Sequence, residues 1–200
     1  MYKLARLQHV SCNLCAIILS RFGSLYHVFT RPLTQFLSSE KSSKRVLFVC
    51  KGNICRSPYA EAKLRATLLH KGISGISISS AGFAATSGKS ANEVGIAVAH
   101  LRGIDLCDHK TKELDSATLN EADIIFLMDP SHRKALIALA REHALTELQS
   151  HAMFLGALGV PHGEPLIIED PYGRGKEAFE KAFDSIDIAI EEFVERIANG

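Results

Sequence analysis

The 200-residue sequence lacks several features that would assign it to a common class of protein. It contains no tryptophan, and its longest N-terminal apolar stretch, Leu14–Leu19, is far too short to span a bilayer. The formal net charge is only +1, so the composition gives no sign of a large nucleic-acid footprint. Five cysteines, an odd number, form no disulfide-scaffold pattern. A hydrophobic content of 46% is still ample for the core of one domain.

Acidic residues are missing from the first part of the chain. No Asp or Glu occurs from Met1 to Ser39, where Lys, Arg and Ser are frequent. This composition is typical of a transit peptide, and a start codon assigned too far upstream would give the same pattern. Cys12 and Cys15 form a C-x-x-C pair with no second pair and no nearby histidine pair, so we interpret the spacing as coincidence rather than zinc binding. We therefore expect an N-terminal extension and linker over residues 1–44 and one domain over residues 45–200.

Strand and helix patterns alternate through residues 45–200. Apolar runs predict strands at 45–49, 76–80, 124–128 and 151–155. Between them lie predicted helices at 57–70, 92–101, 116–121 and 130–143, and a last helix has one apolar stripe from Phe179 to Ile197. This alternation predicts an α/β three-layer sandwich, in which a four-stranded parallel sheet is flanked by helices. Ligands of such sheets bind beyond the carboxyl ends of the strands.

The first predicted strand runs directly into Cys50-Lys51-Gly52-Asn53-Ile54-Cys55-Arg56-Ser57, and Pro58 then opens a helix. Unpaired N–H groups and partial positive charge at a helix N-terminus bind phosphate. Gly52 lets the backbone turn tightly, and Arg56 supplies a planar fork of donors for two phosphate oxygens. The same field stabilises the thiolate of Cys50, which can then accept a phosphoryl group. The alternative, a buried cysteine that merely ends a strand, does not account for the glycine, arginine, serine and proline that follow. A nucleotide-binding loop is disfavoured because no G-x-G-x-x-G or Walker-type spacing is present.

These residues resemble the phosphate-binding loop of the low-molecular-weight protein tyrosine phosphatases, and the resemblance extends from about Arg45 to the C-terminus. It implies that Cys50 attacks phosphotyrosine and that Arg56 binds the phosphoryl oxygens. Asp170, in the Asp-Pro-Tyr sequence at 170–172, is then the general acid, although Asp-Pro alone is a common start of a turn. Tyr172 is expected to line the substrate cleft. The reaction requires no cofactor and no metal.

The same resemblance implies a set of supporting residues. A hydrogen-bonded network is expected to hold the loop, with Asn53 in a left-handed backbone conformation and Ser57 beside the leaving thiolate. Each supporting residue has an ordinary alternative as a helix cap, a surface residue or a core residue. The expected network comprises Asn53, Ser57, Ser80 and His109, with Asp129 holding the arginine and Cys55 able to form a reversible disulfide with Cys50.

Two loop positions bear on specificity. Ile54 is the usual residue in relatives that act on phosphotyrosine, whereas relatives that act on phosphoarginine tend to carry Thr, so that substrate is disfavoured. Lys51, on the cleft rim, is predicted to favour acidic sequences around the phosphotyrosine. Cys107 is expected to be buried and inert.

Two rival functions share parts of this pattern. A thioredoxin-coupled arsenate reductase has the same loop but needs further cysteines downstream, and a non-catalytic phosphopeptide-binding module would not need Cys50, Arg56 and Asp170 together. The expected partners are a tyrosine-phosphorylated protein and a paired tyrosine kinase, with no nucleic acid, and the oligomeric state stays open. A nucleophilic thiol favours a reducing compartment, so we expect the cytoplasm, or a plastid or mitochondrion if residues 1–44 are a transit peptide.

Overall fold

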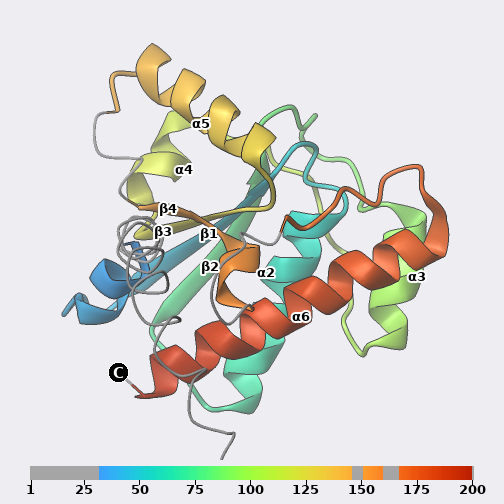
Figure 1. Ribbon diagram of the computed structural model, residues 1–200, viewed down its shortest axis with the longest axis horizontal. Helices are drawn as coiled ribbons and strands as arrows, with labels where there is room; N and C mark the ends of the chain where they lie inside the picture. The colour runs from blue at the N-terminus through green and yellow to red at the C-terminus, as the bar shows by residue number, and fades with distance from the viewer. Residues whose placement is uncertain (1–31, 146–150, 160–166, 200) are drawn as a thin grey trace, which may run out of the picture.

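The structure is a computed structural model that describes residues 32–145, 151–159 and 167–199 (Figure 1). The acid-poor segment before residue 32, with its Cys12 and Cys15, lies outside the described residues, so the transit-peptide interpretation stays a prediction. In the described ranges, no helix combines the length and the apolar character needed to cross a membrane.

A four-stranded parallel sheet forms the centre of the molecule, as predicted. Its strands are β1 (Lys44–Cys50), β2 (Ile76–Gly82), β3 (Ile124–Leu127) and β4 (Ala152–Phe154), in the order β2-β1-β3-β4. The central strand β1 is buried from Val46 to Cys50, since layers cover it on both faces. Its carboxyl end therefore opens onto the edge where a ligand of this fold would bind.

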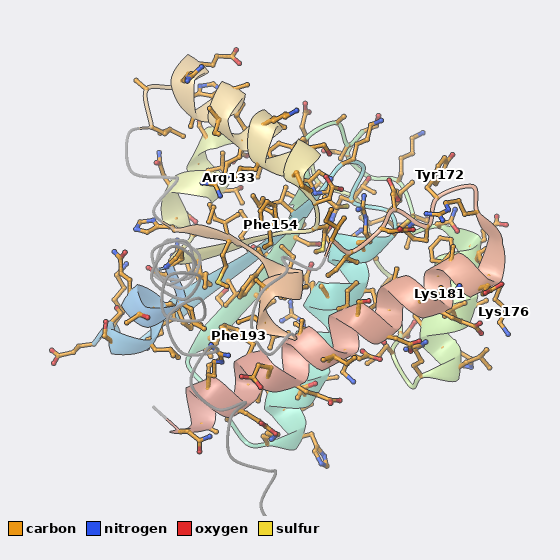
Figure 2. All side chains as sticks on the ribbon, viewed as in Figure 1. Arg133, Phe154, Tyr172, Lys176, Lys181 and Phe193 are labelled. Atoms are coloured by element: carbon orange, nitrogen blue, oxygen red, sulfur yellow. The ribbon has the colours of Figure 1, made fainter. Side chains whose placement is uncertain are left out.

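Helices cover both faces of the sheet (Figure 1). On one face lie α2 (Arg56–His70), α3 (Glu93–Leu101) and α6 (Gly175–Asn199), and on the other lie α4 (Ser116–Glu121) and α5 (Pro130–Glu142). The apolar stripe of α6 faces the core, where Phe183 and Phe193 are completely buried (Figure 2 labels Phe193). The bounds predicted for the strands and for α2 to α5 agree with the structure to within one or two residues, and α6 begins four residues before the predicted stripe. A short 3₁₀ helix, η2 (Leu155–Leu158), follows β4 and was not predicted.

Residues 32–38 are also helical, and they pack onto the core from outside the predicted domain. Leu33 and Phe36 are each only 2% exposed. The Phe36 ring lies 5.6 Å from the Phe193 ring of α6, and Lys44 Nζ lies 5.2 Å from the centre of the Phe36 ring. The packed body of the protein therefore begins before residue 45. Composition placed these residues in the N-terminal extension and linker, because it does not show that Phe36 packs against Phe193.

Truncation of Phe36 is expected to destabilise the domain. Phe36→Ala should lower the free energy of unfolding by about 3–5 kcal/mol, because it leaves a cavity against Phe193. Urea denaturation measures this difference. Ser38→Ala, which changes an exposed side chain on the same helical segment, should shift stability by less than about 0.5 kcal/mol. Equal stability of the two variants would contradict the packing role of Phe36.

Candidate active site

Cys50 ends β1, and α2 begins six residues later at Arg56; we call residues 50–57 the cysteine loop. The thiol is buried, with its Sγ 3.2 Å from the backbone nitrogen of Asn53 and 3.0 Å from Ser57 Oγ. Both groups can donate a hydrogen bond to a thiolate. They lie at the N-terminus of α2, where the unpaired N–H groups of the helix also favour negative charge.

The loop turns at Asn53, whose φ of 52° confirms the predicted left-handed backbone. A Cβ added at Gly52 would meet only the Ile54 side chain, at an ordinary 3.5 Å. The tight approach occurs instead at Gly82, at the end of β2. There a Cβ would lie 2.8 Å from both Asn53 N and Lys51 O, so a larger residue would displace the loop. Nothing in the sequence around Gly82 indicated this close approach.

Asn53 also holds the network that was expected around it. Its Nδ2 donates to Ser57 Oγ and to Ser80 Oγ, each at 2.9 Å, and its Oδ1 accepts from the backbone nitrogen of Lys112 at 2.9 Å. His109 Nε2 lies 2.8 Å from the Asn53 carbonyl oxygen and must donate to it, because a carbonyl can only accept. Since Ser57 Oγ accepts from Asn53, its own proton is available to Cys50.

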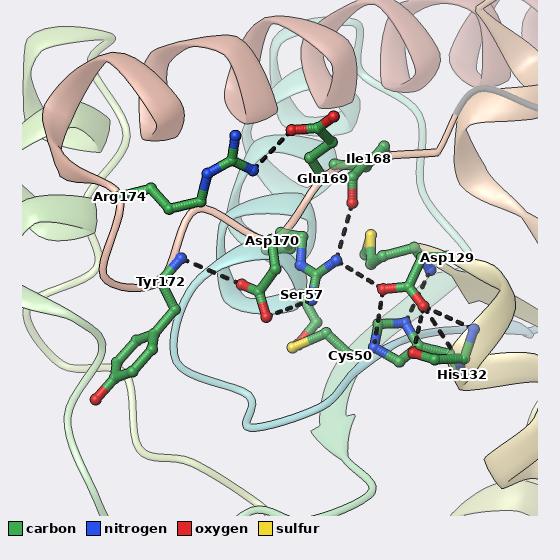
Figure 3. Close-up of polar contacts among 12 residues, drawn as sticks. Cys50, Ser57, Asp129, His132, Ile168, Glu169, Asp170, Tyr172 and Arg174 are labelled. Carbon is green, nitrogen blue, oxygen red and sulfur yellow. Dashed lines mark hydrogen bonds and ion pairs between the residues drawn. The ribbon is translucent and has the colours of Figure 1, made fainter.

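The guanidinium of Arg56 joins three segments of the chain (Figure 3). Its Nη1 donates to Asp129 Oδ2 at 2.9 Å and to the Ile168 carbonyl at 2.8 Å, and its Nη2 lies 3.0 Å from Asp170 Oδ2. Arg56 is 2% exposed, and its Nε is buried with no hydrogen-bond partner among the described residues. A buried donor of this kind is rare unless a ligand uses it.

Asp170 lies on the segment before α6, which we call the acid loop (residues 167–174). Its side chain is 46% exposed, so solvent reaches the carboxylate. The backbone nitrogen of Tyr172 donates to Asp170 Oδ1 at 3.3 Å, while Tyr172 itself is 62% exposed beside it. A thiol, a buried cation and an accessible carboxylate thus converge at the carboxyl end of the sheet. Over the described ranges, no three potential metal-ligating side chains gather into a site.

The family model of the low molecular weight phosphotyrosine protein phosphatases matches residues 45–200. The chain belongs to this family. It is 35% identical over 154 residues to the "Probable low molecular weight protein-tyrosine-phosphatase EpsP" of Ralstonia nicotianae, an alignment that covers 77% of this chain and 96% of that protein.

Solved structures of this family share the fold. Wzb of Vibrio vulnificus in complex with benzylphosphonate is 33% identical, with a TM-score of 0.65 over 76% of this chain and 98% of its own. The YwlE arginine phosphatase of Geobacillus stearothermophilus is 27% identical, with a TM-score of 0.67 over 78% of this chain and 94% of its own. The segment at residues 32–38 lies before the stretch that the family model covers.

Besides Gly82, two supporting residues of this phosphatase, Glu61 and His132, were not predicted from the sequence. Glu61 Oε2 accepts from Ser80 Oγ at 2.7 Å, which turns the lone pairs of Ser80 toward Asn53. Its position four residues after Ser57, on the same face of α2, could have indicated that Glu61 lies near this network. Arg65 pairs with Glu61 at 2.9 Å and fixes this carboxylate in turn.

His132 is the second missed residue. It is 3% exposed, its Nδ1 accepts from the backbone nitrogen of Met128 at 3.3 Å, and its Nε2 lies 3.4 Å from Asp129 Oδ2. Burial lowers the pKa of His132 to about 4, against the attraction of Asp129. Its position could have indicated this contact, because His132 is the third residue after Asp129, the N-cap of α5, and a side chain there can reach back to the cap residue.

Asp129 occupies that cap position and also faces Arg56. Its Oδ1 accepts from the backbone nitrogens of Ser131 and His132, which satisfies the start of α5. Burial raises the pKa of Asp129, but the hydrogen bond from Ser131 and the charges of His132 and Arg56 outweigh burial and hold it below its usual value. The carboxylate is therefore ionised beside the guanidinium.

The remaining cysteines differ from one another. Cys55 is buried, and burial together with the neighbouring Cys50 raises the pKa of its thiol to about 12, so it is a neutral thiol at ordinary pH. Both loop cysteines are free, and the disulfide between them stays a prediction. Cys107 was expected to be buried, but this was wrong, because it lies exposed in the turn after α3.

In the cysteine loop, Lys51 is exposed and Ile54 is half-buried and packs against the hydrophobic core. Glu169 is 72% exposed and pairs with Arg174 at 2.7 Å, so its charge is directed away from Asp170 (Figure 3).

His132 makes the stability of the domain depend on pH. Its pKa is lower in the folded chain than its ordinary value of 6.5, so its contribution is present above about pH 6.5 and is lost as the pH falls toward 4. His132→Asn cannot titrate there. The advantage of the wild type over this variant in unfolding free energy should therefore shrink by about 3 kcal/mol between pH 7.5 and pH 4. Urea titrations of both proteins at several pH values measure it, and a constant difference would contradict the burial of a neutral imidazole.

Proposed function

We propose that this phosphatase hydrolyses phosphotyrosine in proteins in two steps, with Cys50 as nucleophile, Arg56 as the phosphoryl-binding cation and Asp170 as general acid and base. The observation that carries the assignment is the position of Arg56. It is buried in the same loop as the thiol, it pairs with Asp170, and its Nε has no hydrogen-bond partner among the described residues. A phosphoryl group bound there would lie between the nucleophile and the acid.

In the first step, the thiolate of Cys50 attacks phosphorus. The S–P bond forms as the bond from phosphorus to the tyrosine oxygen breaks, and Asp170 gives its proton to that oxygen. The backbone N–H groups of the cysteine loop and the fork of Arg56 stabilise the negative charge on the phosphoryl oxygens in the transition state.

In the second step, water attacks the phosphorus of the cysteinyl phosphate. Asp170, now a carboxylate, takes a proton from the water, and the S–P bond breaks to release inorganic phosphate. The leaving thiolate of Cys50 receives the hydrogen bond of Ser57, whose Oγ lies 3.0 Å from the sulfur and 3.5 Å from its other acceptor, the Ala81 carbonyl. The enzyme returns to its starting state without a cofactor.

Ile54 and Lys51 support a phosphotyrosyl protein as the substrate. The half-buried Ile54 offers an apolar surface next to the phosphate-binding residues, and exposed Tyr172 adds an aromatic surface. The relative YwlE is described as an arginine phosphatase, so phosphoarginine is the appropriate competing substrate. An arsenate reductase is disfavoured because, within the described ranges, Cys107 is the single cysteine outside the loop.

Two variants test the assigned roles. Cys50→Ser should lose all detectable turnover while it still binds phosphate, because the loop donors remain. Asp170→Asn should slow phenyl phosphate by about 10²–10⁴-fold but p-nitrophenyl phosphate far less, because an activated leaving group needs little protonation. Steady-state kinetics on both esters measures this. Turnover in Cys50→Ser, or equal losses on both esters in Asp170→Asn, would refute the assignment.

The charge of Lys51 is expected to set a preference for acidic substrates. Lys51→Leu should reduce kcat/KM for a phosphotyrosyl peptide with flanking Glu residues by about three- to tenfold at low salt, and should leave a neutral peptide unchanged, since a rim charge acts at long range. Kinetics on the matched peptides, with phosphoarginine peptides alongside, measure the preference. Unchanged kinetics on both peptides would exclude this role, and faster hydrolysis of phosphoarginine would exclude phosphotyrosine as the preferred substrate.

A further inference from the structure

Five contacts close a ring that connects the cysteine loop, the start of α5 and the acid loop; we call it the Arg56 circuit, and Figure 3 shows its part around Asp129, His132 and the Ile168 carbonyl. Arg56 Nη1 donates to the Ile168 carbonyl at 2.8 Å, and the Ile168 nitrogen donates to the Met128 carbonyl at 3.0 Å. The Met128 nitrogen donates to His132 Nδ1 at 3.3 Å, and His132 Nε2 lies 3.4 Å from Asp129 Oδ2, which accepts from Arg56.

His132 joins two halves of this circuit through opposite sides of one ring. A backbone N–H can only donate, so Nδ1 must be the acceptor and the proton of the neutral imidazole is on Nε2, facing Asp129. Nε2 is buried and has no full hydrogen bond among the described residues, which leaves Asp129 as its polar neighbour. With the ring 3% exposed, bulk water cannot replace either contact.

The two sides of the ring act on different parts of the reaction. Through Nε2, His132 supports the carboxylate that orients the fork of Arg56. Through Nδ1, it fixes the backbone of Met128, whose carbonyl holds Ile168 at the base of the acid loop. Ile168 is completely buried, and Asp170 follows two residues later, so a shift of Ile168 would move the acid.

We propose that His132 is a positioning residue that aligns Arg56 with the phosphoryl group through Asp129, and Asp170 with the leaving group through Met128 and Ile168. His132 touches neither substrate nor reacting atoms, and its effect passes through these neighbours. The proposal rests on the function proposed above, in which Arg56 binds the phosphoryl group and Asp170 is the acid.

Two substitutions separate the two sides of the ring. In His132→Asn, the amide oxygen can replace Nδ1 as the acceptor from Met128, but the side chain no longer reaches Asp129. In His132→Gln, the amide nitrogen can replace the Nε2 donor toward Asp129, but the acceptor for Met128 is lost. His132→Ala removes both contacts, and Leu136→Ala, which opens a cavity at a buried position one turn later on α5, serves as the stability control.

Two readouts are measured on each variant: competitive inhibition by inorganic phosphate, which reports Arg56, and the dependence of kcat on the leaving group across a series of aryl phosphates, which reports Asp170. His132→Asn should weaken phosphate binding about tenfold and keep the wild-type dependence on the leaving group. His132→Gln should keep phosphate binding but slow phenyl phosphate about tenfold, with p-nitrophenyl phosphate changed less than about twofold.

His132→Ala should show both effects, and Leu136→Ala should lower the melting temperature without either. If the three His132 variants change only the melting temperature, as Leu136→Ala does, or if His132→Asn and His132→Gln give the same pattern, the proposal is wrong. Wild-type turnover and its loss in Cys50→Ser are measured alongside. If the wild type is active and the His132 variants change neither phosphate binding nor the dependence on the leaving group, this inference alone is refuted. An inactive wild type would instead refute the proposed function.

Discussion

The functional end of the fold depends on one buried cation, the guanidinium of Arg56. Burial of an uncompensated charge costs several kcal/mol, so the surrounding chain must supply acceptors. It does so from three places: Asp129 at the start of α5, the carbonyl of Ile168 in the acid loop, and Asp170 itself. Segments more than 70 residues apart in sequence are thereby brought to one point, at the carboxyl end of β1. The requirement to neutralise this cation explains why the acid loop lies where it does.

A second constraint, the backbone conformation of the cysteine loop, places hydrogen-bond donors around the sulfur of Cys50. Asn53 holds a left-handed conformation that directs its N–H at Cys50, and its side chain is fixed by Ser57, Ser80 and Lys112. Gly82 allows β2 to approach this turn closely. The donors around the sulfur are therefore in place before a substrate binds, and little reorganisation is needed as charge develops on the phosphoryl group.

Much of this could be predicted from the sequence, because strand and helix periodicity and the spacing from Cys50 to Ser57 are local signals. The four strands, the long α6 and the phosphate-binding role of Cys50 and Arg56 were anticipated in this way, whereas the role of Asp170 came from the resemblance to the phosphatase family. Glu61, His132 and Gly82 were not. Glu61 and His132 stand at helical spacings from Ser57 and Asp129, but spacing alone does not show their contacts with Ser80 and Met128, and the approach of Gly82 to the cysteine loop leaves no signal in the sequence. The burial of Phe36 and the exposure of Cys107 were missed for the same reason: composition describes a segment, whereas burial depends on which elements pack against it.

The two-step mechanism requires a covalent intermediate at Cys50, and trapping that intermediate tests the mechanism most directly. The Asp170→Asn variant, in which the second step lacks its base, is mixed with p-nitrophenyl phosphate and quenched in acid within milliseconds. Mass spectrometry of the digested protein then locates the phosphoryl group. We predict a phosphoryl adduct on the peptide that contains Cys50, bound to that sulfur, and none after Cys50→Ala is introduced. An adduct on another residue, or continued release of nitrophenol in the Cys50→Ala protein, would contradict the account.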